Sequence, residues 1–146
     1  MNKVLLMLAL AGVLLAASGG AARAAQLVGN SGSCADIPHG DTSDGTPMAL
    51  FHCHGSPNQN WVLTAGTITG LNGTCLDVMG SVARDGAQII VVQCNGRASQ
   101  KWQVVNGQIV GLGSKCLDVQ NGSSADTAPL ILNSCGPAPS QQWSIQ

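Results

Sequence analysis

The sequence predicts an all-β fold built from three copies of one unit. Its tryptophans lie at positions 61, 102 and 143, so that 102 − 61 and 143 − 102 both equal 41. Two sets of cysteines keep the same interval: Cys34, Cys75 and Cys116, and Cys53, Cys94 and Cys135. Between these markers lie short runs of branched residues bounded by Asn-Gly or Asp-Gly. A fixed interval of this size is typical of one supersecondary unit copied in tandem.

The same interval extends to polar residues. Three sets share it: Asp36, Asp77 and Asp118; Asp44, Asp85 and Asp126; and Gln59, Gln100 and Gln141. The repeats therefore span about 26–66, 67–107 and 108–146. Units of this size cannot bury a core separately, so we expect them to close around a pseudo-threefold axis.

The start of the chain predicts a signal peptide over residues 1–24. A short positive segment, Met1 to Lys3, precedes the apolar stretch from Val4 to Ala17, and the Ala22-Arg23-Ala24 segment has the form that signal peptidase cleaves. An uncleaved membrane anchor is the alternative. Cleavage predicts a secreted or periplasmic protein, and residues 25–146 then form one domain without a linker.

The charge of residues 25–146 disfavours a nucleic-acid partner. Four basic residues stand against seven aspartates and no glutamate, which gives a net charge of −3. No basic stripe is present to neutralise phosphates. No apolar run after residue 24 is long enough for a membrane span. No cofactor motif is found either, and a protein partner stays possible.

Six cysteines in an exported chain predict disulfides. Three pairings preserve the threefold repeat: each first cysteine joins the second cysteine of its own, the next or the previous unit. Pairing within the unit closes the shortest loops, with 19 positions between partners. Each such loop stabilises the fold by roughly 3 kcal/mol. The alternative of a zinc site lacks the Cys-x-x-Cys spacing.

Within a unit the pattern is that of short strands. Residues 88–92 and 130–132 are rich in branched side chains, and Asn106-Gly107 separates residues 103–105 from 108–110 as a hairpin turn. No segment after residue 24 keeps a helical apolar spacing. About four strands in each unit predict about twelve in all.

The motifs follow one order along the chain: Cys-x-Asp, then Asp-Gly, a branched strand, a second Cys and Gln-x-Trp. This order resembles that of the ricin B-chain-like β-trefoil lectins, also called Q-x-W carbohydrate-binding modules. The resemblance covers the whole of residues 25–146. It implies a β-trefoil with disulfides inside each repeat and up to three shallow sugar pockets. It further implies a galactose- or xylose-type ligand.

In that family, a pocket uses an acid after the first cysteine and an aromatic ring two positions before the second. It also uses a polar residue four positions before that cysteine and an Asn-Gln pair. Carried over to the first repeat, these are Asp36, Phe51, Asn58 and Gln59, with Ala49 departing from the polar residue. A carboxylate accepts strong hydrogen bonds from hydroxyls, and a ring covers the apolar face of a sugar.

The later repeats match less well. The second keeps Asp77 and Gln100, and the third keeps Asp118, Asn133 and Gln141, but neither has an aromatic platform. We therefore expect the best pocket in the first repeat and weaker ones elsewhere.

Structural roles compete with these binding roles. The recurring aspartates suit turn bonding and the recurring glutamines suit buried amides, while the three tryptophans are expected in the core. Phe51 is the single phenylalanine of the chain and lies at a position that does not repeat as aromatic, so its placement is the informative one. Covering the strand beneath it is the alternative role.

Catalysis and metal binding have little support. The repeat spreads most aspartates apart, whereas glycoside hydrolysis needs two carboxyls within roughly 5–10 Å. His52 and His54 flank Cys53, a spacing that suits either a metal or the rim of the sugar pocket. We predict a non-enzymatic, secreted carbohydrate-binding protein without a metal. A trefoil used for protein interaction, as in a protease inhibitor or toxin delivery subunit, is the alternative, and a scaffold without sugar affinity is a third.

Overall fold

The computed structural model describes residues 23–146, and over this range it is all-β. Its strands are β1 (Leu27–Gly29), β2 (Ser33–Asp36), β3 (Thr46–Pro47), β4 (Ala49–His52), β5 (Val62–Thr64), β6 (Thr67–Thr69), β7 (Thr74–Val78), β8 (Ile89–Gln93), β9 (Gln103–Val105), β10 (Gln108–Val110), β11 (Cys116–Val119), β12 (Leu130–Asn133) and β13 (Trp143–Ile145). Single 3₁₀ turns connect them: η1 (Pro38–Gly40), η2 (Pro57–Gln59), η3 (Leu71–Gly73), η4 (Met79–Ser81), η5 (Ala98–Gln100), η6 (Leu112–Ser114), η7 (Gln120–Gly122) and η8 (Pro139–Gln141).

Residues 23–146 hold thirteen strands, one more than the sequence predicts. The additional strand is β3, which pairs with β8 over two residues. Its counterparts, Gln88 and Pro129, form isolated single-residue bridges in the other repeats. The hairpin of β9 and β10 is confirmed, and β8 begins one residue later than expected.

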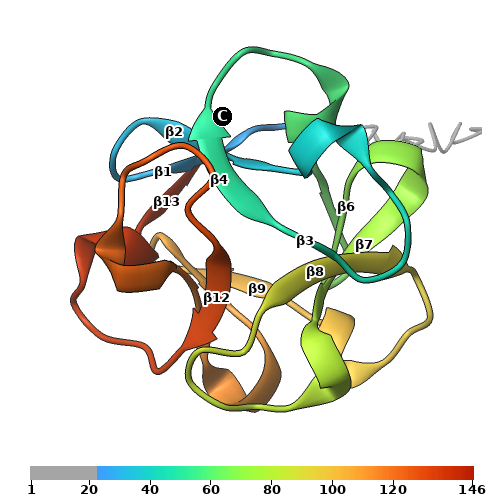
Figure 1. The fold of residues 1–146 in the computed structure, drawn as a ribbon. Helices are drawn as coiled ribbons and strands as arrows, with labels where there is room; N and C mark the ends of the chain where they lie inside the picture. The colour runs from blue at the N-terminus through green and yellow to red at the C-terminus, as the bar shows by residue number, and fades with distance from the viewer. Residues whose placement is uncertain (1–22) are drawn as a thin grey trace, which may run out of the picture.

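The three repeats close into a ring, as the sequence predicts. The same position in each repeat pairs with the neighbouring repeat: Pro47 with Ile90, Gln88 with Ile131, and Pro129 with Ala49. In Figure 1, β4, β8 and β12 lie around the centre of the ribbon, each from one repeat. The third pairing joins the last repeat to the first, so the pseudo-threefold arrangement is complete.

A hairpin joins each repeat to the next, and the third hairpin is open. The pairs β5–β6 and β9–β10 are joined by two-residue turns, with positive φ at Ala65 and Asn106. The equivalent third pair consists of β13 and β1, the last and first strands of the chain. The two ends are held together by reciprocal backbone hydrogen bonds between Gln26 and Gln146, at 2.6 and 3.0 Å.

The tryptophans fill the core, as predicted. Trp61 is fully buried and its Nε1 donates to the backbone oxygen of Ala35 at 3.1 Å; Trp102 and Trp143 repeat this bond to Leu76 and Leu117. The Trp61 ring lies so close to Gly70 that a Cβ there would come within 2.6 Å of it. The Trp61 ring therefore needs a glycine at position 70.

Two kinds of link stabilise the fold, one within each repeat and one between repeats. Disulfides join the cysteines of each repeat, Cys34–Cys53, Cys75–Cys94 and Cys116–Cys135, which confirms the pairing within the unit. The second link runs between repeats, where an aspartate accepts from the backbone N–H that precedes a neighbour's second cysteine. These bonds are Gln93 to Asp44 (2.8 Å), Ser134 to Asp85 (2.8 Å) and His52 to Asp126 (2.7 Å).

The predicted signal peptide, residues 1–24, lies almost wholly outside the described residues. Over residues 23–146, no helix has the length and apolar character needed to cross a membrane.

Candidate functional site

A cavity of about 250 Å³ lies in the first repeat, where the sequence places the best pocket. Asp36, Phe51 and Asn58 line it, and Ala49, His54 and Thr127 complete much of its wall. Three of the four predicted binding residues therefore reach one hollow. The fourth, Gln59, is fully buried beside Asp36.

Two paired strands set the spacing of this site. Asp36 ends β2 opposite Ala49 in β4, and Phe51 lies two residues further along β4, opposite Cys34. Side chains two apart on a strand point to the same face, so Ala49 and Phe51 face the same side. The η2 turn then carries Asn58 to the carboxylate, where its Nδ2 donates to Oδ2 of Asp36 at 3.2 Å.

The Asp36 carboxylate has one occupied and one available oxygen. Its Oδ2 accepts from Gln59 at 2.8 Å and from Asn58, and Nε2 of His54 lies 3.5 Å from it. Within residues 23–146, no hydrogen bond uses Oδ1 of Asp36. A buried carboxylate held rigidly by two amides, with an oxygen left beside a cavity, is suited to accept hydrogen bonds from a ligand.

The second and third repeats use that oxygen internally. Oδ1 of Asp77 accepts from the backbone N–H of Val78, and Oδ1 of Asp118 accepts from that of Val119, both at 2.7 Å. The turn-bonding role is therefore present in these two repeats. In the first repeat, the equivalent N–H of Ile37 donates instead to the backbone oxygen of Asn58 at 3.0 Å.

Asn58 explains this difference. Its Nδ2 donates to the backbone oxygen of Ile37 at 3.0 Å, while its own backbone oxygen accepts from the N–H of Ile37. This two-way link holds η2 against the end of β2 and gives the Ile37 N–H a partner other than Asp36. Ser99 and Ser140 occupy the equivalent positions, and a serine side chain is too short to make the side-chain half of this link.

Phe51 is half-buried and forms part of the cavity wall beside Asp36. Its ring centroid lies 4.4 Å from that of His52 and 5.8 Å from that of His54. The ring is thus supported by two imidazoles and keeps an accessible part of its surface at the hollow. This is the arrangement that a platform for the apolar face of a sugar requires.

The buried glutamines fill the same structural role in all three repeats. The Nε2 of Gln59 donates to Asp36 and to the backbone oxygen of His52, while its Oε1 accepts from the N–H of His54. Gln100 and Gln141 make the same three bonds in their own repeats. Gln59 therefore orients the Asp36 carboxylate.

The residues predicted for weaker pockets are brought together but are already bonded to one another. In the third repeat, Oδ2 of Asp118 accepts from Asn133 and Gln141, each at 3.1 Å, and its Oδ1 accepts from Val119. In the second repeat, Asp77 is bonded by Gln100 and Val78 in the same way. Neither carboxylate keeps an unused oxygen.

Sequence reasoning missed Thr127 and His39 as cavity residues and placed His52 and His54 only loosely. His54 lines the cavity, whereas His52 turns to the third repeat, where its Nδ1 lies 2.8 Å from Oδ2 of Asp126. This hydrogen bond holds the pKa of Asp126 below its usual value. Among residues 23–146, no three His, Cys, Asp or Glu side chains are grouped to hold a metal ion.

A signal for Thr127 does exist in the sequence. The positions 41 and 82 residues earlier are Gly86 and Gly45, so the third repeat has a threonine where the others have glycine. This departure from the repeat singles out Thr127 but does not say which cavity it lines.

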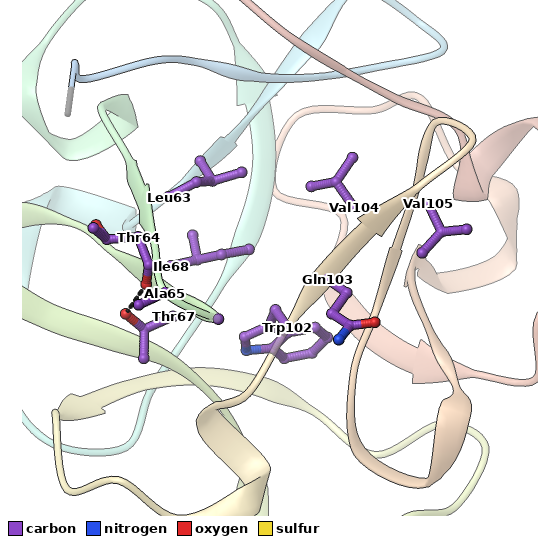
Figure 2. Close-up of a pocket in the computed structure, with 10 residues that line it drawn as sticks. Leu63, Thr64, Ala65, Thr67, Ile68, Trp102, Gln103, Val104 and Val105 are labelled. Atoms are coloured by element: carbon purple, nitrogen blue, oxygen red, sulfur yellow. Dashed lines mark hydrogen bonds between the residues drawn. The ribbon is translucent and has the colours of Figure 1, made fainter. Parts of the chain in front are cut away.

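A larger hollow, of about 570 Å³, lies between the β5–β6 hairpin and β9 (Figure 2). Leu63 and Ile68 approach it from the hairpin, and Trp102 and Val104 approach it from the other side. No carboxylate or imidazole lines it. The smaller cavity in the first repeat therefore holds the chemistry for a polar ligand, although it has less volume.

The closed ring of repeats, the three disulfides and the Gln-x-Trp core define a β-trefoil protein of the lectin class. The chain belongs to the family of the ricin-type beta-trefoil lectin domain, whose model matches residues 23–143. This membership confirms the resemblance found in the sequence and supports carbohydrate binding.

Solved structures agree on the fold. A designed threefold-symmetric protein, ThreeFoil, is 30% identical with a TM-score of 0.78, covering 84% of this chain and 96% of its own. A non-toxic homologue of type II RIPs from bitter gourd (Momordica charantia), solved with α-methyl-D-galactoside, is 25% identical with a TM-score of 0.76, over 84% of this chain and 47% of its own. The C-half of an earthworm R-type lectin, solved with GalNAc, is 19% identical with a TM-score of 0.75, over 85% of this chain and 98% of its own.

Proposed function

We propose that this chain is an exported, non-enzymatic carbohydrate-binding protein whose sugar site is the cavity of the first repeat. The observation that carries the proposal is the available Oδ1 of Asp36 beside the Phe51 ring. Asp36 accepts hydrogen bonds from sugar hydroxyls, Asn58 adds an amide, and Phe51 covers the apolar face of the ring. Gln59 acts through Asp36.

Galactose- and xylose-type sugars are the ligands to test. The bitter gourd protein was solved with a galactoside and the earthworm lectin with GalNAc, which supports the galactose type. Export is supported by the three disulfides, because disulfides persist in oxidising compartments. Mass spectrometry of the exported chain tests this part: loss of residues 1–24 is expected.

The binding test is calorimetric titration with methyl α-D-galactoside and with xylose, after a glycan array has ranked them. We expect Asp36→Asn and Phe51→Ala each to weaken binding at least about ten-fold, or about 1.4 kcal/mol. Val92→Ala, which truncates the counterpart of Phe51 in the second repeat, is the matched control and should bind like the wild type. Thermal unfolding of each variant checks that the fold is intact. Unchanged affinity in both pocket variants would disprove the site.

A protein-interaction module is the second candidate, and one observation favours it. Val104 and Val105 are exposed by 45% and 44% at the hollow of Figure 2, which places apolar surface at the hairpin end of the molecule. If neither sugar binds and the array is blank, this surface becomes the leading site. Binding of a sugar that Asp36→Asn abolishes decides in favour of the first candidate.

A further inference from the structure

The first-repeat cavity lies next to a second hollow of about 430 Å³. Pro38, His39, Ala49 and Thr127 line both, so the two spaces adjoin along a shared wall. The cavity alone is smaller than the roughly 300–1,000 Å³ typical of ligand pockets. The adjoining hollow therefore gives a ligand in the first repeat room to extend.

The second hollow lies at the pseudo-threefold axis, and we call it the axial hollow. Pro47, Gln88 and Pro129 all line it, and they occupy one position of the repeat, separated by 41 residues. Equivalent residues from three repeats can meet in one hollow only near the axis that relates them. A ligand that extends from the first-repeat cavity in this direction reaches the surface where the pseudo-threefold axis emerges.

Ala49 takes up little space in the wall that the two hollows share. It lies on the same face of β4 as Phe51 and contributes only a methyl group to both walls. The equivalent positions in the other repeats are Ile90 and Ile131, both large and buried. The alanine that departs from the expected polar residue thus leaves more space at this shared wall than an isoleucine would.

Thr127 stands at the same boundary in an unfavourable backbone conformation. Its φ is +72°, a value that glycine adopts readily and a β-branched residue rarely does. Gly45 and Gly86 hold the equivalent positions at φ +92° and +86°. Within residues 23–146, no hydrogen bond uses the Thr127 hydroxyl, and strain of this kind is concentrated at functional sites.

The second hollow offers the contacts that a sugar residue needs. Asp41 and Gln88 are exposed polar side chains on its wall, while Pro47 and Pro129 present apolar surface. Hydrogen bonding from Ser43 holds the pKa of Asp41 below its usual value, so Asp41 is an ionised acceptor at neutral pH. Mixed acceptors and apolar faces are the same chemistry as in the first cavity.

We propose that the axial hollow is a subsite for the next sugar residue, so that the ligand is a glycan of at least two residues. The proposal rests on the sugar site proposed for the first repeat. One residue lies against Phe51 and Asp36, and its neighbour passes Ala49 and Thr127 toward Gln88 and Asp41.

The test compares glycan length. Binding is measured by calorimetry for methyl α-D-galactoside and xylose and for their di- and trisaccharides, with linkages chosen from a glycan array. The wild type should bind its preferred disaccharide or trisaccharide at least about ten-fold more tightly than the terminal monosaccharide. Gln88→Ala and Asp41→Asn, which line the axial hollow and not the first cavity, should keep the monosaccharide affinity and reduce this ratio toward one.

Three further variants use the differences between the repeats. Ala49→Ile installs the residue of the other repeats and should remove the length advantage, whereas Ile90→Val, at the equivalent position of the second repeat, should preserve it. Thr127→Gly should reduce the ratio without lowering the melting temperature. Equal affinity for every length in the wild type overturns the subsite and leaves the first-repeat site standing. No binding at any length overturns both.

Discussion

Asp36 and Asp77 occupy the same position in two repeats, and both carboxylates are buried. Each receives a glutamine amide on Oδ2, at 2.8 Å for Asp36 and 3.0 Å for Asp77. They differ at Oδ1, which in Asp77 accepts from the N–H of Val78 and in Asp36 has no bond within the described part of the chain. The same residue is thus a closed structural element in one repeat and an available acceptor in the other.

This difference teaches that the repeated residues build the scaffold and the residues that depart from the repeat build the site. Asn58, Phe51 and Ala49 are replaced in the second repeat by Ser99, Val92 and Ile90. The aspartate and glutamine are conserved between repeats because they stabilise the fold. What surrounds them decides whether the aspartate is also available to a ligand.

The largest expected effect comes from removing each of the two carboxylates. Asp77→Ala should lower the free energy of unfolding by about 2–4 kcal/mol, because it leaves the Val78 N–H without a partner and removes one of the two acceptors of the Gln100 amide. Asp36→Ala should cost about 1 kcal/mol less, since the Ile37 N–H is bonded to Asn58. Urea unfolding measures both. Equal losses would show that Oδ1 plays the same part in both repeats.

The next effect tests the reason for the difference. Asn58→Ser copies the second repeat and removes the side-chain bond to the Ile37 oxygen, which loosens η2 so that the Ile37 N–H can turn to Asp36. We expect sugar affinity to fall about ten-fold, or about 1.4 kcal/mol, with little loss of stability. Ser99→Ala in the second repeat is the matched control, and calorimetric titration is the measurement. Wild-type affinity in Asn58→Ser would mean that Asn58 does not keep Asp36 available.

The smallest effect concerns the aspartates between repeats. Hydrogen bonding from Lys115 and Ser134 lowers the pKa of Asp85, and that from His52 lowers the pKa of Asp126. A lowered folded-state pKa gives stability that is present above the unfolded-state value of about 3.9 and is lost as the pH falls below it. In Asp85→Asn, the free energy of unfolding should therefore fall less steeply than in the wild type as the pH drops from about 5 to about 2. Urea unfolding followed by circular dichroism at each pH measures this. The same pH dependence in the variant and the wild type would contradict this role of Asp85.

Much of the fold could be predicted because the interval of 41 residues is preserved in several residue types. Cys34, Trp61 and their counterparts predict the core and the number of repeats and reduce the disulfides to three symmetric pairings, of which the structure has the one with the shortest loops. The thirteenth strand could not be predicted, because β3 differs from the bridges at Gln88 and Pro129 by a single residue of pairing. Such a difference depends on backbone geometry and leaves no pattern in the sequence.

The site residues that belong to the first repeat were predictable, and the residue contributed by another repeat was not. Asp36, Phe51 and Asn58 lie in one repeat, and the structure brings them to one cavity. Thr127 reaches the same cavity from the third repeat, because Asp126 beside it is bonded to His52. The availability of Oδ1 also escaped prediction, since it depends on which of two acceptors the Ile37 N–H chooses.

The open third hairpin has a consequence for how the chain can be rearranged. Gln26 and Gln146 are hydrogen-bonded where the other repeats have a two-residue turn, so residues 26–146 form a nearly closed loop. Joining these ends with a short turn and cutting between Ala65 and Gly66 would give a circular permutant that keeps every strand pair. In such a protein the second repeat would be made first, and the first repeat last, around the same axis.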